Sequence, residues 1–187
     1  MAKVILFRAQ PFHNGHLNMV KMALRDCKQD ERLYIFLGSA DKNKTVRNPF
    51  SAAERSFMIE YALYQELPKD DWCRVILTWL DDLIAEEDNS YEWGQYLYDR
   101  VYNTTRDSII DIYYTDHLEI ITSWFSKELE DKINIIPLEK KDNISATRVR
   151  QDIVAENWDA LKAEVPKNVY DLRTFLKERL EKINDIN

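Results

Sequence analysis

Short apolar segments alternate with amphipathic helical segments along most of this sequence, and no other feature limits the fold as strongly. The predicted strands are residues 3–8, 33–37, 75–79, 109–114 and 133–136. The predicted helices are residues 17–27, 51–64, 90–102, 118–129, 145–154 and 168–183. Strands that are separated by helices pair in parallel through right-handed crossovers. The sequence therefore predicts an α/β fold, in which a parallel sheet of about five strands carries helices on both faces.

Length and composition indicate one globular domain. The chain has 187 residues, of which 45% are hydrophobic and 12% aromatic, and this is enough for one sizeable core. We therefore expect a single domain over residues 1–187, with a core of about residues 1–161. An amphipathic C-terminal helix of about residues 168–184 extends this core. That helix either covers the sheet or contacts a second copy, so a homo-oligomer is left open.

Charge and cysteine usage argue against several classes of protein. A net charge of −7 disfavours a nucleic-acid-binding protein, although a local arginine cluster can still bind an anionic small molecule. Cys27 and Cys73 are expected to be buried free thiols, and with three histidines they form no zinc-binding set. No stretch resembles a signal peptide or a membrane span. We expect a cytoplasmic protein that has no nucleic-acid or membrane partner.

The turn after the first predicted strand contains His13-Asn14-Gly15-His16, which includes two of the three histidines in the chain. A helix begins here, and the unpaired N–H groups at a helix N-terminus attract anions. Imidazole donates to phosphate oxygens and can respond to the charge that develops during displacement at phosphorus. Gly15 lets the backbone approach a ligand closely. A helix cap with a packed ring is the structural alternative, but the combination predicts a phosphate-binding turn.

A second candidate site is the segment Ile144-Ser145-Ala146-Thr147-Arg148-Val149-Arg150. Ser145 is a suitable N-cap, but a capping box would place Glu or Gln at position 148, where this chain has Arg. Arg148 and Arg150 in the first helical turn oppose the helix dipole. A bound polyphosphate would offset this repulsion, because hydroxyl, N–H and guanidinium groups would all donate to it.

Four motifs together resemble a known family. They are Arg8-x-Gln10-Pro11-Phe12-His13-x-Gly15-His16, Gly38-Ser39-Ala40, Asn48-Pro49-Phe50-Ser51-Ala52-x-Glu54-Arg55 and Ile144-Ser145-x-Thr147-x-x-Arg150. In this order they resemble the HxGH nucleotidyltransferase superfamily, and within it the nicotinamide-nucleotide adenylyltransferases of the archaeal type. The resemblance is strong over about residues 3–61 and 144–161.

The resemblance implies a Rossmann-like fold and a reaction of ATP with nicotinamide or nicotinate mononucleotide, which gives NAD or deamido-NAD and pyrophosphate. The acceptor phosphate would attack the α-phosphorus in line, so positioning and charge stabilisation would supply the rate. The catalytic residues would be His13, His16 and Arg150. The ATP-binding residues would be Arg8, Gln10, His13, His16, Arg47, Ser145, Thr147 and Arg150. Mg²⁺ would bind mainly phosphate oxygens and water, so we name no protein metal ligand.

The resemblance also implies an acceptor site, which would be formed by Gly38, Ser39, Asp82 and Trp93. The Trp93 indole would stack on the pyridine ring, but Trp93, Tyr96 and Leu97 also form an ordinary apolar helix stripe. The residue that meets the acceptor ahead of this tryptophan is left open among Asp81, Asp82 and Asn89.

Other interpretations of the same motifs remain open. After the fourth strand, Thr115-Asp116-His117 replaces a Gly-Asn pair of the archaeal proteins, so the adenosine contacts are not assigned. An alternative enzyme would run the same chemistry with phosphopantetheine, flavin mononucleotide or a polyol phosphate as acceptor, and with either ATP or CTP as donor. A nucleotide-binding sensor without catalysis is the alternative from another class.

Overall fold

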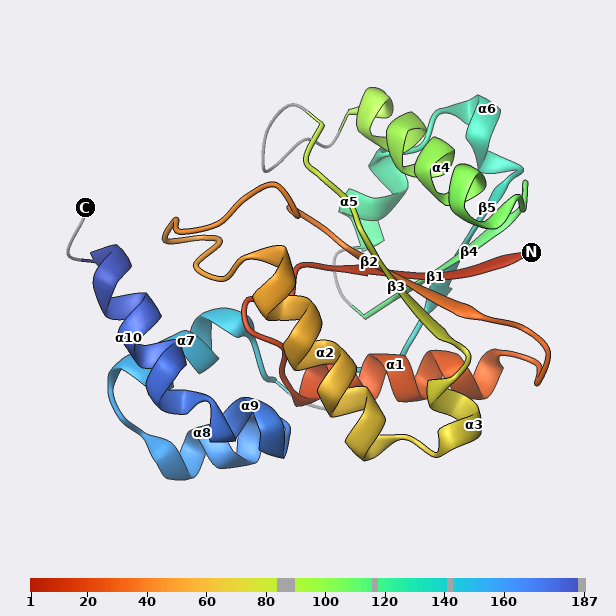
Figure 1. Ribbon diagram of the computed structural model, residues 1–187. Helices are drawn as coiled ribbons and strands as arrows, with labels where there is room; N and C mark the ends of the chain where they lie inside the picture. The colour runs from red at the N-terminus through yellow and green to blue at the C-terminus, as the bar shows by residue number, and fades with distance from the viewer. Residues whose placement is uncertain (84–89, 116–117, 141–142, 185–187) are drawn as a thin grey trace.

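The computed structural model describes residues 1–83, 90–115, 118–140 and 143–184. Its centre is one five-stranded sheet in the order β3-β2-β1-β4-β5, and every strand pair is parallel (Figure 1). The strands are β1 Ala2–Phe7, β2 Leu33–Leu37, β3 Val75–Trp79, β4 Ile110–Tyr114 and β5 Ile133–Pro137. The predicted α/β fold is therefore confirmed. The strand order reverses at β1, and in such sheets ligands bind beyond the carboxyl ends of the strands at the reversal.

Helices cover both faces of the sheet (Figure 1). They are α1 Asn14–Asp26, α2 Ala52–Glu66, α3 Lys69–Trp72, α4 Tyr91–Thr105, α5 Leu118–Ser123, α6 Lys127–Glu130, α7 Ala146–Val154, α8 Trp158–Glu164, α9 Lys167–Asp171 and α10 Arg173–Asn184. Successive strand residues point to opposite faces, so Val4 packs under α4 while Ile5 packs under α1 and α2. Within the described ranges, no helix combines the length and the hydropathy that a membrane span requires.

Three local predictions were wrong. The single helix predicted over residues 118–129 is two helices, because Ser126 adopts an extended N-cap conformation and starts α6. The single helix predicted over residues 168–183 is α9 and α10, which are separated at Leu172. Cys73 is exposed in the turn after α3, whereas Cys27 is buried as predicted, and both are free thiols.

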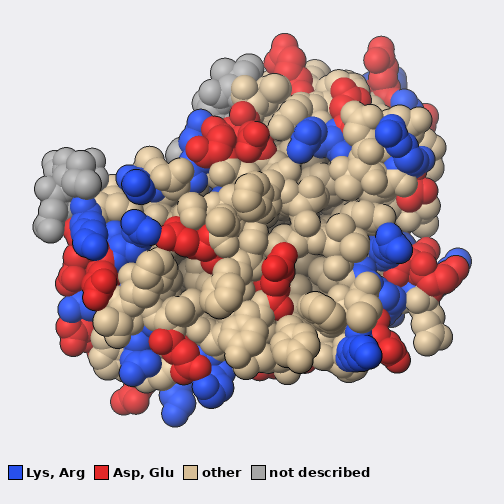
Figure 2. All heavy atoms as spheres, in the orientation of Figure 1, with Lys and Arg blue, Asp and Glu red and all other residues tan. Residues whose placement is uncertain are grey.

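The face of the molecule seen in Figure 2 has a largely uncharged centre, with Lys, Arg, Asp and Glu gathered around it. Five exposed aromatic side chains belong to α2, α3 and β3, and they are Phe57, Tyr61, Tyr64, Trp72 and Trp79.

Gly94 allows α4 to approach the segment that follows α5. A Cβ at this position would lie 1.8 Å from the Trp124 carbonyl oxygen and 2.6 Å from its carbon, and both are backbone atoms. Gly94→Ala is therefore expected to lower the free energy of unfolding by about 2 kcal/mol, although alanine otherwise favours a helix interior. Chemical denaturation measures this change.

Gly38→Ala is the matched control for this prediction. A Cβ at Gly38 would meet its nearest neighbours at 3.7 Å, which is ordinary contact. The control is expected to change the free energy of unfolding by less than about 0.5 kcal/mol. Equal effects of the two substitutions would show that the approach at Gly94 is not tight.

Candidate active site

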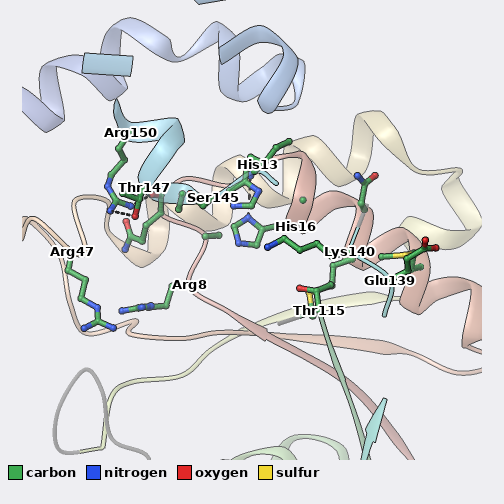
Figure 3. A pocket seen from close by; sticks show the side chains of 18 residues that line it. Arg8, His13, His16, Arg47, Thr115, Glu139, Lys140, Ser145, Thr147 and Arg150 are labelled. Atoms are coloured by element: carbon green, nitrogen blue, oxygen red, sulfur yellow. Dashed lines mark hydrogen bonds between the residues drawn. The ribbon is translucent and has the colours of Figure 1, made fainter. Parts of the chain in front are cut away.

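A pocket of about 580 Å³ lies beyond the carboxyl ends of the strands, next to the N-termini of α1 and α7 (Figure 3). All eight residues that the sequence analysis assigned to ATP line it, and they are Arg8, Gln10, His13, His16, Arg47, Ser145, Thr147 and Arg150. They come from segments up to about 140 positions apart in the chain. The fold therefore brings together the two motifs that sequence analysis treated separately.

The two histidines of the first motif are stacked at the start of α1. His13 is the N-cap residue, and its ring centroid lies 3.7 Å from that of His16. The His13 backbone N–H donates to Nδ1 of His16 over 3.3 Å. Phe7 and Phe12 also pack on the His16 ring. Because Nδ1 accepts a hydrogen bond, a neutral His16 carries its proton on Nε2, which is then the donor of this ring.

The surroundings of His16 keep its ring neutral. Burial lowers the pKa of His16 well below the usual value of 6.5, and the neighbouring His13 lowers that pKa further. A neutral ring at the N-terminus of α1 avoids repulsion by the helix dipole. The Nε2–H of the neutral His16 ring is therefore a hydrogen-bond donor at pH 7.

This shift predicts how stability depends on pH. The pKa of His16 is lower in the folded chain than in the unfolded one, so only the unfolded chain binds this proton as the pH falls through 6.5. The free energy of unfolding is therefore expected to decrease below that pH. Thermal unfolding of the wild type between about pH 7 and about pH 5 should show a falling Tm, and His16→Gln should reduce the fall. The same fall in both proteins would contradict the shift.

The second motif forms the N-terminus of α7. Ser145 is the N-cap, and its hydroxyl accepts a hydrogen bond from the Arg148 backbone N–H. The Arg150 guanidinium donates to the Gln10 carbonyl over 2.8 Å and to Thr147 Oγ1 over 3.3 Å. Burial lowers the pKa of Arg150, and the nearby positive charge of Arg8 lowers it further. These contacts orient Arg150 in the wall of the pocket (Figure 3).

Arg148 does not join Arg150 in the pocket wall. Its Nε lies 2.7 Å from Glu164 Oε1 on α8 and 3.9 Å from Asp152 Oδ2. Burial raises the pKa of Glu164, while Arg148 opposes this rise. The expectation that a bound polyphosphate would offset the charge of both arginines therefore does not hold for Arg148, because a carboxylate of the next helix pairs with it.

The Gln10 side chain connects two loops. Its Nε2 donates to the Phe50 carbonyl over 3.0 Å and to Asn48 Oδ1 over 3.3 Å, and its Oε1 accepts from the Phe50 N–H over 3.0 Å. The carboxamide is only 3% exposed as part of this arrangement. Gln10 therefore holds the segment around Phe50 against the first loop, and its contact with ATP stays a prediction.

The four residues predicted to bind the acceptor lie outside the lining of this pocket. Gly38 and Ser39 follow β2, and the Ser39 hydroxyl donates to Asp82 Oδ1 over 2.9 Å. Trp93 is 8% exposed and packs against Tyr96 and Trp124 on the other face of the sheet. This position agrees with the apolar stripe, and the stacking role stays a prediction. Asn89, Asp116 and His117 lie outside the described residues.

At the other end of the pocket, the sequence left Thr115 without an assigned role and gave no indication of Glu139 and Lys140, and it assigned no role to Arg55 beneath the pocket. Thr115 follows β4, and Glu139 and Lys140 follow β5, so all three reach the pocket from the carboxyl edge of the sheet (Figure 3). Arg55 of α2 is completely buried. A sequence signal for Arg55 exists, because it stands among the core-facing positions of α2, which are Ala52, Met58, Ile59, Ala62 and Leu63.

Comparison with known proteins places this geometry in a family. Residues 8–152 match the family model described as cytidylyltransferase-like. The nicotinamide-nucleotide adenylyltransferase of Saccharolobus solfataricus is 30% identical over 182 residues, which are 94% of this chain and 92% of that protein. The enzyme of the same name from Thermococcus sibiricus is 28% identical over 185 residues, which are 95% of this chain and 84% of that protein.

Solved structures agree with the fold. A bifunctional NMN adenylyltransferase/ADP ribose pyrophosphatase from Francisella tularensis, complexed with AMP and a manganese ion, superposes with a TM-score of 0.63 at 27% identity. The match covers 83% of this chain but 42% of that longer chain. The chain therefore belongs to the cytidylyltransferase-like family, and within it is an enzyme of the nicotinamide-nucleotide adenylyltransferase type.

Proposed function

We propose that this enzyme joins ATP to nicotinamide or nicotinate mononucleotide, giving NAD or deamido-NAD and pyrophosphate. The observation that carries the proposal is the pocket in which His13 and His16 meet Arg150, Thr147 and Arg8. A triphosphate carries several negative charges, and this wall offers guanidinium, hydroxyl and imidazole donors together with a helix N-terminus. The names of the relatives support a pyridine mononucleotide as the acceptor.

The proposed mechanism depends on positioning and charge. The acceptor phosphate attacks the α-phosphorus in line, and the bond to the leaving pyrophosphate breaks. The neutral His16 Nε2–H donates to an α-phosphate oxygen, on which charge increases in the transition state. Arg150 is held by the Gln10 carbonyl and by Thr147, so it meets the phosphates with little reorganisation. Arg8 and Arg47 bind the remaining phosphate oxygens.

The pocket suits Mg²⁺ that is bound to the nucleotide. Among the residues that the structure describes, its lining includes one carboxylate, Glu139, against the four Lys and Arg side chains of Arg8, Arg47, Lys140 and Arg150. Such a donor set favours phosphate oxygens over protein side chains as ligands of the ion. When bound, the ion would neutralise charge on the phosphates and on the leaving pyrophosphate.

The test is pyrophosphate release from ATP and Mg²⁺ with a panel of acceptors. The panel contains nicotinamide and nicotinate mononucleotide, phosphopantetheine, flavin mononucleotide and glycerol phosphate. Turnover with a pyridine mononucleotide is the expected result, and the ratio of the amide and acid rates gives the preference. Turnover only with another acceptor would keep the phosphate site and overturn the acceptor. ATP binding without any turnover would favour a sensor.

A further inference from the structure

Arg55 is a buried cation that the mechanism above does not use. It lies in the first turns of α2, its exposed fraction is 0%, and it is the largest of the fully buried side chains. Burying a charge is costly unless hydrogen bonds replace its hydration. Arg55 forms no ion pair with a carboxylate among the residues that the structure describes. Its role therefore depends on which groups receive its hydrogen bonds.

The Arg55 guanidinium connects the loops that follow β1 and β2. Nη1 donates to the Arg8 carbonyl over 2.6 Å and to the Gly38 carbonyl over 2.8 Å. Nη2 donates to the Ser39 carbonyl over 2.9 Å, and Nε donates to the Ser51 carbonyl over 3.3 Å. One planar group thus holds the loop that carries Arg8 against the loop that carries Ser39. A lysine, with a single nitrogen, has no such fork.

Both loops contain a residue in a left-handed backbone conformation next to these carbonyls. Ala9 has φ 53° and Ser39 has φ 49°. Such conformations are unfavourable for residues with a side chain and persist where the surroundings hold them. Arg55 helps to stabilise both conformations, because its guanidinium donates hydrogen bonds to the carbonyl of Arg8, which precedes Ala9, and to the carbonyl of Ser39 itself.

The position of Arg55 is electrostatically unfavourable by itself. Burial and the nearby positive charge of Arg8 lower the pKa of Arg55, the charge of Asp82 opposes them, and the resulting pKa is about 10. The guanidinium is still a cation at neutral pH. An apolar side chain of similar length would avoid the desolvation and the repulsion by Arg8, but it would leave the Arg8, Gly38 and Ser39 carbonyls without this donor. Arg55 is therefore retained for its hydrogen bonds to the two loops and not for its charge.

We infer that Arg55 is a positioning residue, whose guanidinium sets the separation between the Arg8 loop and the Ser39 loop. The inference rests on the proposed function, in which Arg8 binds the triphosphate, and on the prediction from the sequence that Gly38 and Ser39 contact the acceptor. In-line attack requires the acceptor phosphate to lie close to the α-phosphorus. Each loop alone can still bind its own substrate. The loss of Arg55 therefore affects the joint geometry of the two substrates more than the binding of either.

The test compares Arg55→Lys and Arg55→Met with Asn168→Ala. Lysine keeps the charge and methionine removes it. Neither side chain can donate to the loop carbonyls of Arg8, Gly38 and Ser39 with a planar fork. Asn168 of α9 is a matched control, because it is also buried, at 3% exposed. Its Nδ2 donates over 3.0 Å to the carbonyl of Met58, which lies in α2 like Arg55 but away from both loops. Each variant is assayed well below its own Tm for kcat, and for the Kd of ATP and of the mononucleotide measured separately.

Arg55→Lys is expected to lower kcat by about 10-fold or more, while each Kd changes by less than about 3-fold. Arg55→Met is expected to show the same pattern together with a lower Tm, and Asn168→Ala a lower Tm with wild-type kcat. Wild-type kcat in Arg55→Lys would overturn the inference, as would a loss of both affinities as large as the loss in kcat. The proposed function is overturned by a different result, which is that the wild type releases no pyrophosphate with any acceptor. That result would also overturn this role of Arg55.

Discussion

Replacing His16 with alanine is expected to lower kcat by a factor of about 10² to 10³, because the substitution removes a donor to charge that develops in the transition state. The Kd of ATP is expected to change by less than about 3-fold, since the ground-state phosphates keep their other partners. The donor in question is Nε2, because Nδ1 already accepts from the His13 N–H. Steady-state kinetics together with direct ATP binding separates these two effects.

His16→Gln is the informative companion to this variant. The side-chain amide of glutamine can place an N–H donor near the position of Nε2, and it does not titrate. We expect its kcat to lie between those of the wild type and His16→Ala. An unchanged kcat in His16→Ala would remove His16 from the mechanism. Equal losses in both variants would show that an imidazole, rather than a neutral donor, is required.

Replacing Arg150 with alanine is expected to lower kcat/KM for ATP by about 10²-fold, which corresponds to the loss of charge-assisted hydrogen bonds to phosphate. The guanidinium is already oriented by the Gln10 carbonyl and by Thr147 Oγ1, so its contacts need little ordering when ATP binds. Arg150→Lys keeps the charge but loses the planar fork, and we expect an intermediate loss. Initial rates at varied ATP concentration provide the measurement.

Arg148→Ala is the matched control for Arg150→Ala. It removes the same side chain from the same helix, but this guanidinium pairs with Glu164 and Asp152 and does not line the pocket. We expect a lower Tm, because Glu164 loses its partner, with kcat/KM for ATP near the wild-type value. Similar losses of kcat/KM in the two variants would indicate a general effect of charge on α7 rather than a specific contact of Arg150.

The strand pattern of this protein follows from its sequence. Each predicted strand lies within one residue of an observed strand at both ends, because continuous apolar runs between helices match strands buried on both faces of a parallel sheet. The helix ends were less predictable. The break before α6 depends on Ser126 as an N-cap, and an amphipathic pattern continues across such a break.

The candidate phosphate site was predictable for the same physical reason. Parallel strands end at one edge of the sheet, so the His13 turn after β1 and the Arg150 helix after β5 converge there despite their separation in sequence. Motif chemistry then identified the residue types that bind phosphate. The sequence by itself therefore determined the fold class and the eight candidate phosphate-binding residues that the fold brings to one pocket.

Only the tertiary structure decided how neighbouring residues of the same type are used. Arg148 and Arg150 are equivalent in local sequence, yet Glu164 of another helix pairs with Arg148 and leaves Arg150 to the pocket. The carbonyls that receive the Arg55 guanidinium belong to two loops, which meet only when β1 and β2 pair. Partners of this kind are set by packing between distant segments, and local propensity and motif spacing carry no information about them.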